Sequence, residues 1–356
     1  MDAEPAATRT VTVREVAARA GVSKATAARV LGGYGSPNQA LRDSVEEAAR
    51  ALGYQPNTLA RSMTTGRSGT IGVVLGDIEN PYFGRALRGI SDVAADAGFD
   101  VLLANSAEDI DKERSAVRVL LGKQVDGLIV TPALMSRFDH LEEARRAGRP
   151  LVLLDRSIPG FVVDSVVSDD KVASFRAASL LLRAGHRRIA YISATSAAEP
   201  VYRGPHQIHL STVLGRIEGM QDALAKAGLD PSAGLIRLGA RSPETTAAIV
   251  RELFGLPARP TAILASDNII ALSVFKTIRE IGLRIPDDVS LIAFTDADWT
   301  SVTAPTVTVI EQPVYELGRE SARILFSRME KPDAEPAQKV IATRLIERAS
   351  VAGPPG

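Results

Sequence analysis

A short basic segment near the N-terminus carries residue types that recognise DNA. In a helix over residues 24–31, the side chains of Lys24, Ala25 and Arg29 point outward. Lys and Arg donate to guanine O6 and N7 or to phosphates, and an Ala methyl suits a thymine methyl. Ser23 stands at the N-cap of this helix, and Thr26 can face phosphate or the interior. These residues predict a DNA-recognition helix; the alternative is a helical bundle with solvated charges.

A second set of candidates follows apolar runs that are typical of buried strands. In open α/β sheets, ligands bind outside the carboxyl ends of the strands. Tyr82 or Phe83 can stack on the face of a ring, and Asp267 can hold hydroxyl groups. The candidate strand ends are Asp77–Phe83, Asp155-Arg156, Ser266-Asp267 and Thr295-Asp296.

Signals for catalysis and for metal binding are weak. The chain has no cysteine, which excludes disulfides and thiolate ligands, and it has no G-x-G-x-x-G after the first strand, no P-loop lysine and no G-x-S-x-G. His206 and His209, even with Glu199, offer two imidazoles at best, whereas zinc needs three or four ligands. We expect no catalytic residue, metal or cofactor, and we interpret residues 193–215 as an exposed or ligand-covering loop. His186 and the adjacent acids Asp169-Asp170 are interpreted as structural, the acids as cap or turn residues.

The basic segment is predicted to form short helices only. Thr12 and Glu15 have capping-box spacing, and the helix that they begin ends at Gly21. The second helix spans residues 24–31, a third ends at Gly53, and a short fourth is expected over residues 58–63. Two short helices joined by a glycine turn, with a third packed across them, form a helix-turn-helix.

From Thr70 onward, apolar runs alternate with amphipathic helices, which is typical of parallel strands buried on both faces. The alternation is too long for one sheet, so we expect a body of two doubly wound α/β subdomains behind the all-α head. The runs are at residues 71–75, 101–103, 127–130, 151–154, 189–192, 262–264 and 290–294.

Charge is distributed unevenly along the 356 residues. The formal net charge is +0, which taken alone argues against a nucleic-acid partner. However, the segment from Arg9 to Arg67 holds nine basic and four acidic residues, so it carries +5 and the rest of the chain −5. The net charge of zero is therefore the sum of a basic N-terminal segment, which we call the head, and an acidic remainder.

The head resembles that of the lactose-repressor (LacI) family of bacterial regulators. The resemblance rests on residues 12–23 (TVREVAARAGVS), on Thr26 with Arg29-Val30-Leu31, and on residues 53–63 (GYQPNTLARSM). It continues to about Arg348. Further similar stretches are DIENPYF at 77–83, GHRRI at 185–189 and IPDDVS at 285–290.

The resemblance implies a homodimer on double-stranded, palindromic operator DNA, with recognition helices in successive major grooves and hinge helices in the minor groove. The hinge helix would be residues 57–63, and its last apolar residue would wedge into the central base step. That residue is Met63 where the family usually has leucine, and an apolar cap on the body is its alternative role. Ala28 replaces a serine usual in the recognition helix, which should weaken one phosphate contact. The DNA contacts so implied are Thr12, Ser23, Lys24, Ala25, Thr26, Arg29, Asn57, Ala60, Arg61 and Met63.

For the body, the resemblance implies a periplasmic-binding-protein-like fold with a small-molecule effector between the subdomains. The resemblance adds two residues to the candidate effector contacts: Arg216, and Arg241 at a position where several members of the family have an aromatic side chain. Thr295 replaces an acid and Ser266 an asparagine, so an anionic sugar derivative is favoured; the alternative is that Arg241 points to solvent. Both induction and co-repression occur in the family. The implied effector contacts are Tyr82, Phe83, Asp155, Arg216, Arg241, Ser266, Asp267 and Thr295.

The expected organisation is a helix-turn-helix domain at 10–56, a hinge and linker at 57–69, and an effector-binding and dimerisation domain at 70–348. The N-subdomain is placed at about 70–165 and 298–330, and the C-subdomain at about 166–297 and 331–348. We expect a cytoplasmic dimer without a membrane partner, because no apolar stretch or signal peptide is present and little chain follows Arg348. The competing interpretations are an enzyme and a solute-binding transport component, which would not need residues 10–64.

Overall fold

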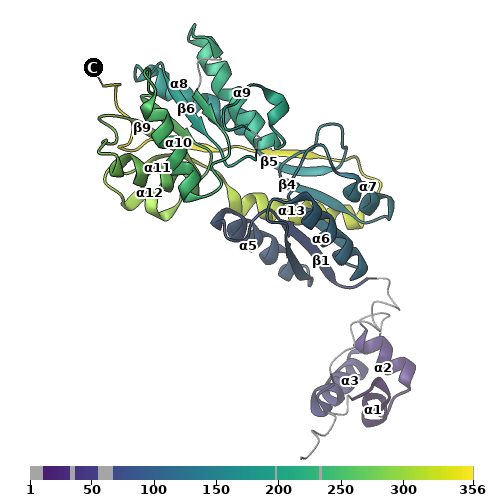
Figure 1. Cartoon of the computed structure of the whole chain (residues 1–356). Coiled ribbons are helices and arrows are strands. Elements are labelled where there is room, and N and C mark those ends of the chain that lie inside the picture. The colour runs from purple at the N-terminus through teal and green to yellow at the C-terminus, as the bar shows by residue number, and fades with distance from the viewer. Residues whose placement is uncertain (1–10, 33–36, 55–66, 197–198, 232–234, 356) are drawn as a thin grey trace, which may run out of the picture. The chain divides into compact units, whose positions relative to one another are not determined.

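The computed structural model describes residues 11–32, 37–54, 67–196, 199–231 and 235–355. The chain divides into two compact units, residues 1–69 and 70–356, which we call the head and the body. Figure 1 shows the helices and strands of both units. No helix in the described ranges is both long and apolar enough to cross a bilayer.

The head is built from three helices around a small core. They are α1 (Val13–Arg19), α2 (Lys24–Leu31) and α3 (Gln39–Leu52), and their N-cap residues are Thr12, Ser23 and Asn38. The Ser23 Oγ accepts from the Thr26 backbone N–H at 3.1 Å, and Gly53 ends α3 with a φ of 63°, which favours glycine. The core consists of Val16, Ala17, Ala27, Val30, Val45, Ala48 and Ala49.

The first subdomain of the body is a six-stranded parallel sheet in the order β11-β5-β4-β3-β1-β2, covered by helices (Figure 1). Its elements are β1 (Thr70–Leu75), α5 (Pro81–Asp96), β2 (Asp100–Asn105), α6 (Ile110–Gly122), β3 (Gly127–Val130), α7 (Asp139–Arg146), β4 (Leu151–Asp155), β5 (Asp164–Ser168), α13 (Val314–Glu330) and β11 (Gln338–Ile341).

The second subdomain repeats this plan with the order β12-β10-β9-β8-β6-β7, in which only the β10–β12 pair is antiparallel. Its elements are α8 (Asp170–Arg183), β6 (Ile189–Ile192), the 3-10 helix η1 (Pro205–Gln207), α9 (Ser211–Lys226), β7 (Leu235–Arg237), α10 (Pro243–Gly255), β8 (Ala262–Ala265), α11 (Asn268–Glu280), β9 (Ser290–Phe294), α12 (Asp298–Val302), β10 (Thr308–Glu311) and β12 (Arg344–Ile346).

The points at which the chain passes from one subdomain to the other differ from the predicted boundaries near residues 166, 298 and 331. The chain crosses between the sheets after β5, after β10 and after β11. Residues 298–311 therefore belong to the second subdomain, where β10 pairs with β9, and residues 338–341 belong to the first, where β11 pairs with β5. These three strands are short and carry polar residues, so no apolar run marks them.

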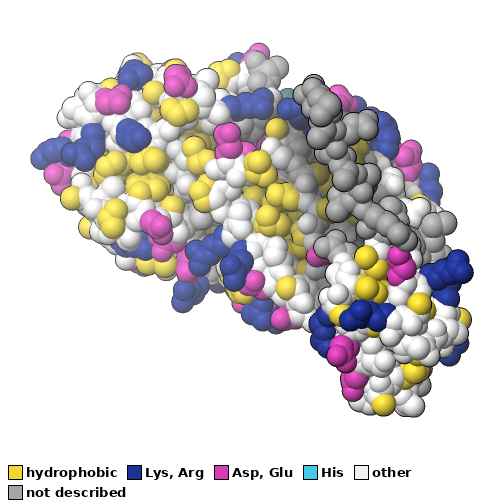
Figure 2. Space-filling view, turned by 90° about the horizontal axis from the view of Figure 1, so that it is seen from below, with side chains coloured by type: hydrophobic (Ala, Val, Ile, Leu, Met, Phe, Trp, Pro, Cys, Tyr) yellow, Lys and Arg dark blue, Asp and Glu magenta, His cyan; other side chains and the backbone are white. Residues whose placement is uncertain are grey.

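Strand β2 also differs from the expectation of burial on both faces. It lies at an edge of its sheet, and Leu102 and Leu103 are 40% and 44% exposed. With Val119 they line a groove beside α6. Figure 2 shows hydrophobic patches among charged side chains on one face of the molecule. The other apolar runs predicted from the sequence are buried strands of the two sheets.

Two helix pairs pack closely because glycine leaves room at the contact. A Cβ added at Gly318 of α13 would lie 2.0 Å from the Ala86 carbonyl oxygen of α5. A Cβ at Gly219 of α9 would lie 2.1 Å from the Lys171 carbonyl oxygen of α8. Each subdomain thus fixes one helix that carries site residues, α5 or α9, against a neighbouring helix.

Candidate effector cavity and DNA-binding head

The carboxyl ends of the parallel strands open onto one cavity of about 1040 Å³, which is lined by both subdomains. This is the position at which open α/β sheets bind ligands. Every effector residue predicted from the sequence lines this cavity, although they are scattered from position 82 to position 295. They are Tyr82, Phe83, Asp155, Arg216, Arg241, Ser266, Asp267 and Thr295.

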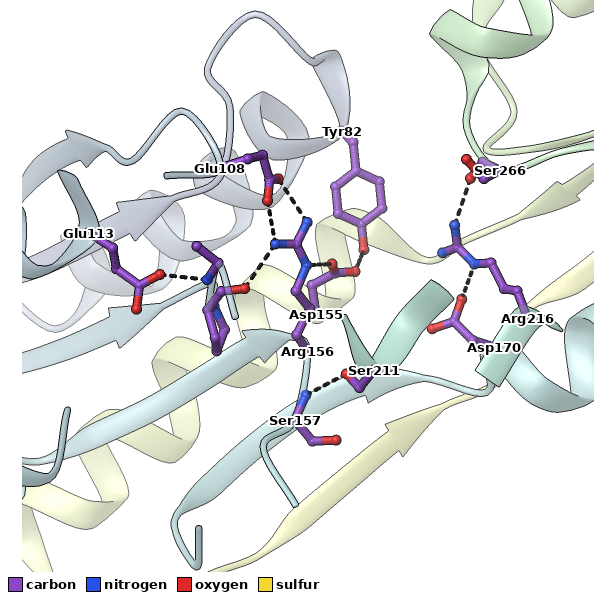
Figure 3. A network of polar contacts seen from close by, with 12 residues as sticks. Tyr82, Glu108, Glu113, Asp155, Arg156, Ser157, Asp170, Ser211, Arg216 and Ser266 are labelled. Atoms are coloured by element: carbon purple, nitrogen blue, oxygen red, sulfur yellow. Dashed lines mark hydrogen bonds and ion pairs between the residues drawn. The ribbon is translucent and has the colours of Figure 1, made fainter. Parts of the chain in front are cut away.

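On the first-subdomain side, the cavity wall is a network around Arg156 (Figure 3). Arg156 donates to both carboxylate oxygens of Glu108, at 2.6 and 2.8 Å, and to the Pro132 carbonyl oxygen at 2.9 Å. Burial disfavours the charged guanidinium, but Glu108 and Asp155 outweigh it and raise the pKa of Arg156. The Tyr82 hydroxyl donates to Asp155, and burial followed by that carboxylate raises the pKa of Tyr82.

On the second-subdomain side, Arg216 of α9 occupies the corresponding place (Figure 3). It donates to Asp170 at 2.6 Å and to the Ser266 carbonyl oxygen at 2.6 Å, and its guanidinium lies 4.0 Å from the centre of the Phe294 ring. Burial raises the pKa of Asp170 to about 6, an effect that Arg216 only partly offsets. The cavity therefore holds two buried guanidinium groups, each oriented by a carboxylate.

Asp267 combines a structural role with access to the cavity. One of its oxygens accepts from the backbone N–H groups of Ile269 and Ile270, at 2.9 and 2.8 Å, and caps helix α11. Burial raises the pKa of this carboxyl. Its other oxygen accepts a long hydrogen bond from Ser266 Oγ, at 3.3 Å.

The remaining predicted residues differ in how they face the cavity. Phe83 is 3% exposed and packs in the apolar core of the first subdomain, while Arg241 is exposed at the cavity edge. Thr295 donates to the Gln312 side chain at 2.8 Å. Asp296, a strand-end candidate, does not line the cavity, because it forms an ion pair with Arg348 at 2.7 Å.

Sequence reasoning missed two carboxylates of this site. Asp170 was interpreted as a cap or turn residue, but it is 7% exposed and is the partner of Arg216. Glu108 lies in the loop after β2, beyond the predicted apolar run 101–103, and this loop was not among the predicted strand-end candidates. For Asp170 the adjacent acids Asp169-Asp170 were the available signal, and only the buried Arg216 distinguishes them from an ordinary helix start.

Two histidine predictions concern structure rather than chemistry. His186 is fully buried and its ring nitrogens contact Thr261 Oγ1, Ser290 Oγ and the Ala352 carbonyl oxygen, at 2.8–3.0 Å. Residues 193–215 supply the η1 helix and the start of α9, and His209 of this loop lines the cavity whereas His206 does not. No group of three or more His, Asp or Glu side chains suited to a metal occurs in the described ranges.

The head presents its predicted recognition residues to solvent. Lys24, Ala25 and Arg29 of α2 are exposed, whereas Thr26 is half-buried and its hydroxyl is 2.9 Å from Ser23 Oγ. Thr12 at the start of α1 donates to Glu15 through its backbone N–H, at 2.8 Å, and through its hydroxyl, at 2.9 Å. Asn57, Ala60, Arg61 and Met63 of the predicted hinge lie outside the described residues.

Comparison with known proteins matches each of the two units to a protein family. Residues 12–57 match the model of bacterial regulatory proteins of the lacI family, and residues 178–351 match the periplasmic binding protein-like domain. The HTH-type transcriptional repressor CytR of Escherichia coli (strain K12) is 31% identical over 95% of this chain and 96% of its own length. The chain belongs to the LacI family. It is a DNA-binding transcriptional regulator, and the resemblance and the fold class predicted from the sequence are confirmed.

Solved structures of LacI-family regulators share this architecture. A regulator from Enterococcus faecium with bound ribose is 29% identical and has a TM-score of 0.68, covering 80% of this chain and 98% of that one. The Lac repressor dimer bound to operator and the anti-inducer ONPF has a TM-score of 0.81, covering 97% of this chain and 100% of that one. At 24% identity, this second likeness shows the fold alone.

Proposed function

We propose that this LacI-family regulator is a repressor whose operator affinity is switched by a small-molecule effector bound in the cavity between the body's subdomains. The observation that carries the proposal is the convergence of all eight predicted effector residues on one cavity. Asp155 ends a strand of the first sheet, whereas Ser266, Asp267 and Thr295 follow strands of the second, so the cavity brings together residues from both subdomains. A regulator rather than an enzyme also fits the relatives, which are transcriptional regulators.

The chemistry of the wall supports a neutral, hydroxyl-rich effector such as a sugar. Six carboxylates and four cationic side chains line the cavity among the described residues. A hydroxyl group can donate to a carboxylate and accept from a guanidinium, so this mixed wall can bind several hydroxyls at once. The ribose bound to the Enterococcus faecium regulator is a ligand of this class.

An anionic sugar derivative is the second candidate, and one observation favours it. Arg241 is exposed at the cavity edge, and no ion pair to it is found in the described part of the chain. Calorimetry with ribose and ribose 5-phosphate separates the two candidates. An anionic effector predicts that the phosphate ester binds more tightly and that Arg241→Ala removes the difference. Binding of neutral sugars alone, unaffected by Arg241→Ala, would exclude it.

We infer that switching is a population shift between arrangements of the subdomains. An effector that binds one arrangement more tightly increases its population. The body continues from the predicted hinge residues 57–69, so a change in the first subdomain alters the spacing of the two hinge segments in a dimer and forms or melts their helices. Measuring operator affinity with and without effector gives the direction of the switch.

The proposal includes a cytoplasmic homodimer on a palindromic operator, because two heads related by two-fold symmetry read two half-sites. The exposed apolar residues Leu102, Leu103 and Val119 offer a surface that a second copy can cover. A mass measurement in solution should give two chains. A mass of four chains, or of one at micromolar concentration, would contradict this part.

The direct test is operator selection with the purified full-length protein, followed by anisotropy titrations with the recovered fragment. We expect a palindromic site and tight binding that is lost in the double variant Lys24→Ala/Arg29→Ala, since both side chains are exposed on α2. Recovery of no enriched sequence would contradict the repressor function.

A further inference from the structure

We propose that residues 199–211 form a clasp that joins the two subdomains at the cavity and makes His209 an effector-binding residue. The clasp belongs to residues 193–215, the segment predicted to be an exposed or ligand-covering loop. The inference rests on the proposed function only for its effector; the clasp itself is a property of the free protein.

The clasp is firmly attached to the second subdomain. Val201 forms an antiparallel bridge with Arg237 of β7, the Tyr202 N–H donates to the Ile236 carbonyl oxygen at 3.2 Å, and the Leu238 N–H donates to the Pro200 carbonyl oxygen at 2.7 Å. Ile208 is 4% exposed and packs in the apolar core beside α9. The segment therefore moves with the second subdomain.

The far end of the clasp reaches the first subdomain at two points. The Met135 N–H donates to the His209 carbonyl oxygen at 2.9 Å, and the Ser157 N–H donates to Ser211 Oγ at 3.0 Å (Figure 3 shows the second contact). Met135 follows β3 and Ser157 follows β4, so both acceptors contact loops at the carboxyl ends of strands. The two hydrogen bonds tie the clasp to adjacent strand ends of the facing sheet.

The same segment supplies part of the cavity wall. His209 and Leu210 line the cavity from the second subdomain, and Ala133 and Leu134, next to Met135, line it from the first. Imidazole can donate or accept a hydrogen bond, and the three apolar neighbours suit the C–H face or an apolar substituent of a sugar. The clasp thus places an imidazole and apolar side chains beside the part of the wall that carries Arg156 and Arg216.

Amide hydrogen exchange at Met135 and Ser157 in the full-length, ligand-free protein tests the clasp. Ser211→Ala removes the acceptor for Ser157 but leaves the His209 carbonyl, which accepts from Met135, untouched. If the two bonds act as one clasp, Ser211→Ala speeds exchange at both amides by roughly fivefold, the effect of losing one hydrogen bond. His206→Ala, a substitution in the same segment but outside the cavity, is the matched control and should change neither amide.

Two results would overturn the clasp: unprotected Met135 and Ser157 amides in the wild type, or an unchanged Met135 amide in Ser211→Ala. A midpoint temperature of thermal unfolding equal to that of the wild type shows that both variants fold.

The effector contact is tested with ribose and ribose 5-phosphate. The variants are compared with the probe that binds the wild-type protein. His209→Ala should weaken its binding roughly fivefold, whereas His206→Ala should not. Equal binding by the two variants would remove His209 from the site. If the wild type binds neither probe, the result counts against the proposed effector chemistry and not against the clasp, which amide exchange decides alone.

Discussion

The pair formed by Asp170 and Arg216 shows how a single buried contact determines the chemistry of the cavity. Both side chains are less than a tenth exposed, and they meet at 2.6 Å. Burial of the carboxylate favours its neutral form. This effect is larger than the stabilisation of the charged form by Arg216, so the pKa of Asp170 rises to about 6. Near neutral pH, a modest change in pH therefore changes the charge beside the guanidinium.

This shift predicts how stability depends on pH. Because folded Asp170 holds its proton more tightly than the unfolded chain does, its contribution to the free energy of unfolding is greatest below pH 3.8 and is lost as the pH rises through about 6. In urea unfolding, the free energy of unfolding of the wild type should fall relative to that of Asp170→Asn as the pH rises over this range. Above this range the difference between the two should stay constant. Other groups cancel in the comparison, so a difference that is independent of pH would contradict the raised pKa.

At the scale of elements, close helix pairs hold α5 and α9, and with them Tyr82 and Arg216, in place. The approach of α13 to α5 requires a glycine at position 318, where a Cβ would lie 2.0 Å from a backbone oxygen. No flexible side chain can move aside at this contact, so the helices themselves must separate.

We therefore expect Gly318→Ala to destabilise the body by about 1–3 kcal/mol, the usual cost of overpacking. The matched control is Gly84→Ala on α5, where an added Cβ meets nothing within 4 Å. It should stabilise the helix by about 0.5–1 kcal/mol, because alanine is the better helix former. Chemical unfolding of both variants gives the two values, and equal effects would show that the close contact is unimportant.

The elements also show which parts of the fold a sequence can predict. β3, β6 and β9 have the predicted bounds because each is a continuous apolar run buried on both faces. β5, β10 and β11 were missed because they are short and carry Ser, Thr, Gln or Lys, and the subdomain boundaries were wrong as a consequence. The cavity was predictable because parallel strands bring their carboxyl ends to one edge, whereas Glu108 and Asp170 depend on tertiary pairing.

At the scale of the whole molecule, the chain joins a basic head to an acidic body whose cavity we propose binds a small ligand. The +5 charge between Arg9 and Arg67 lies in the unit that presents Lys24 and Arg29, and the remainder of the chain is acidic. This distribution concentrates phosphate binding in the head. Operator binding should therefore be electrostatic in part, and its affinity should fall as the salt concentration rises, because the release of counterions from the DNA then contributes less free energy.

A salt titration of operator binding separates sequence-specific recognition from general attraction to DNA. Fluorescence anisotropy is measured for the full-length protein and its selected operator over a range of salt concentrations, with an unrelated fragment as control. We predict specific binding whose log affinity falls steeply and linearly with log salt, by about 0.9 per phosphate contacted. Salt-insensitive binding of micromolar or weaker affinity, equal for the operator and for the unrelated fragment, would contradict the account.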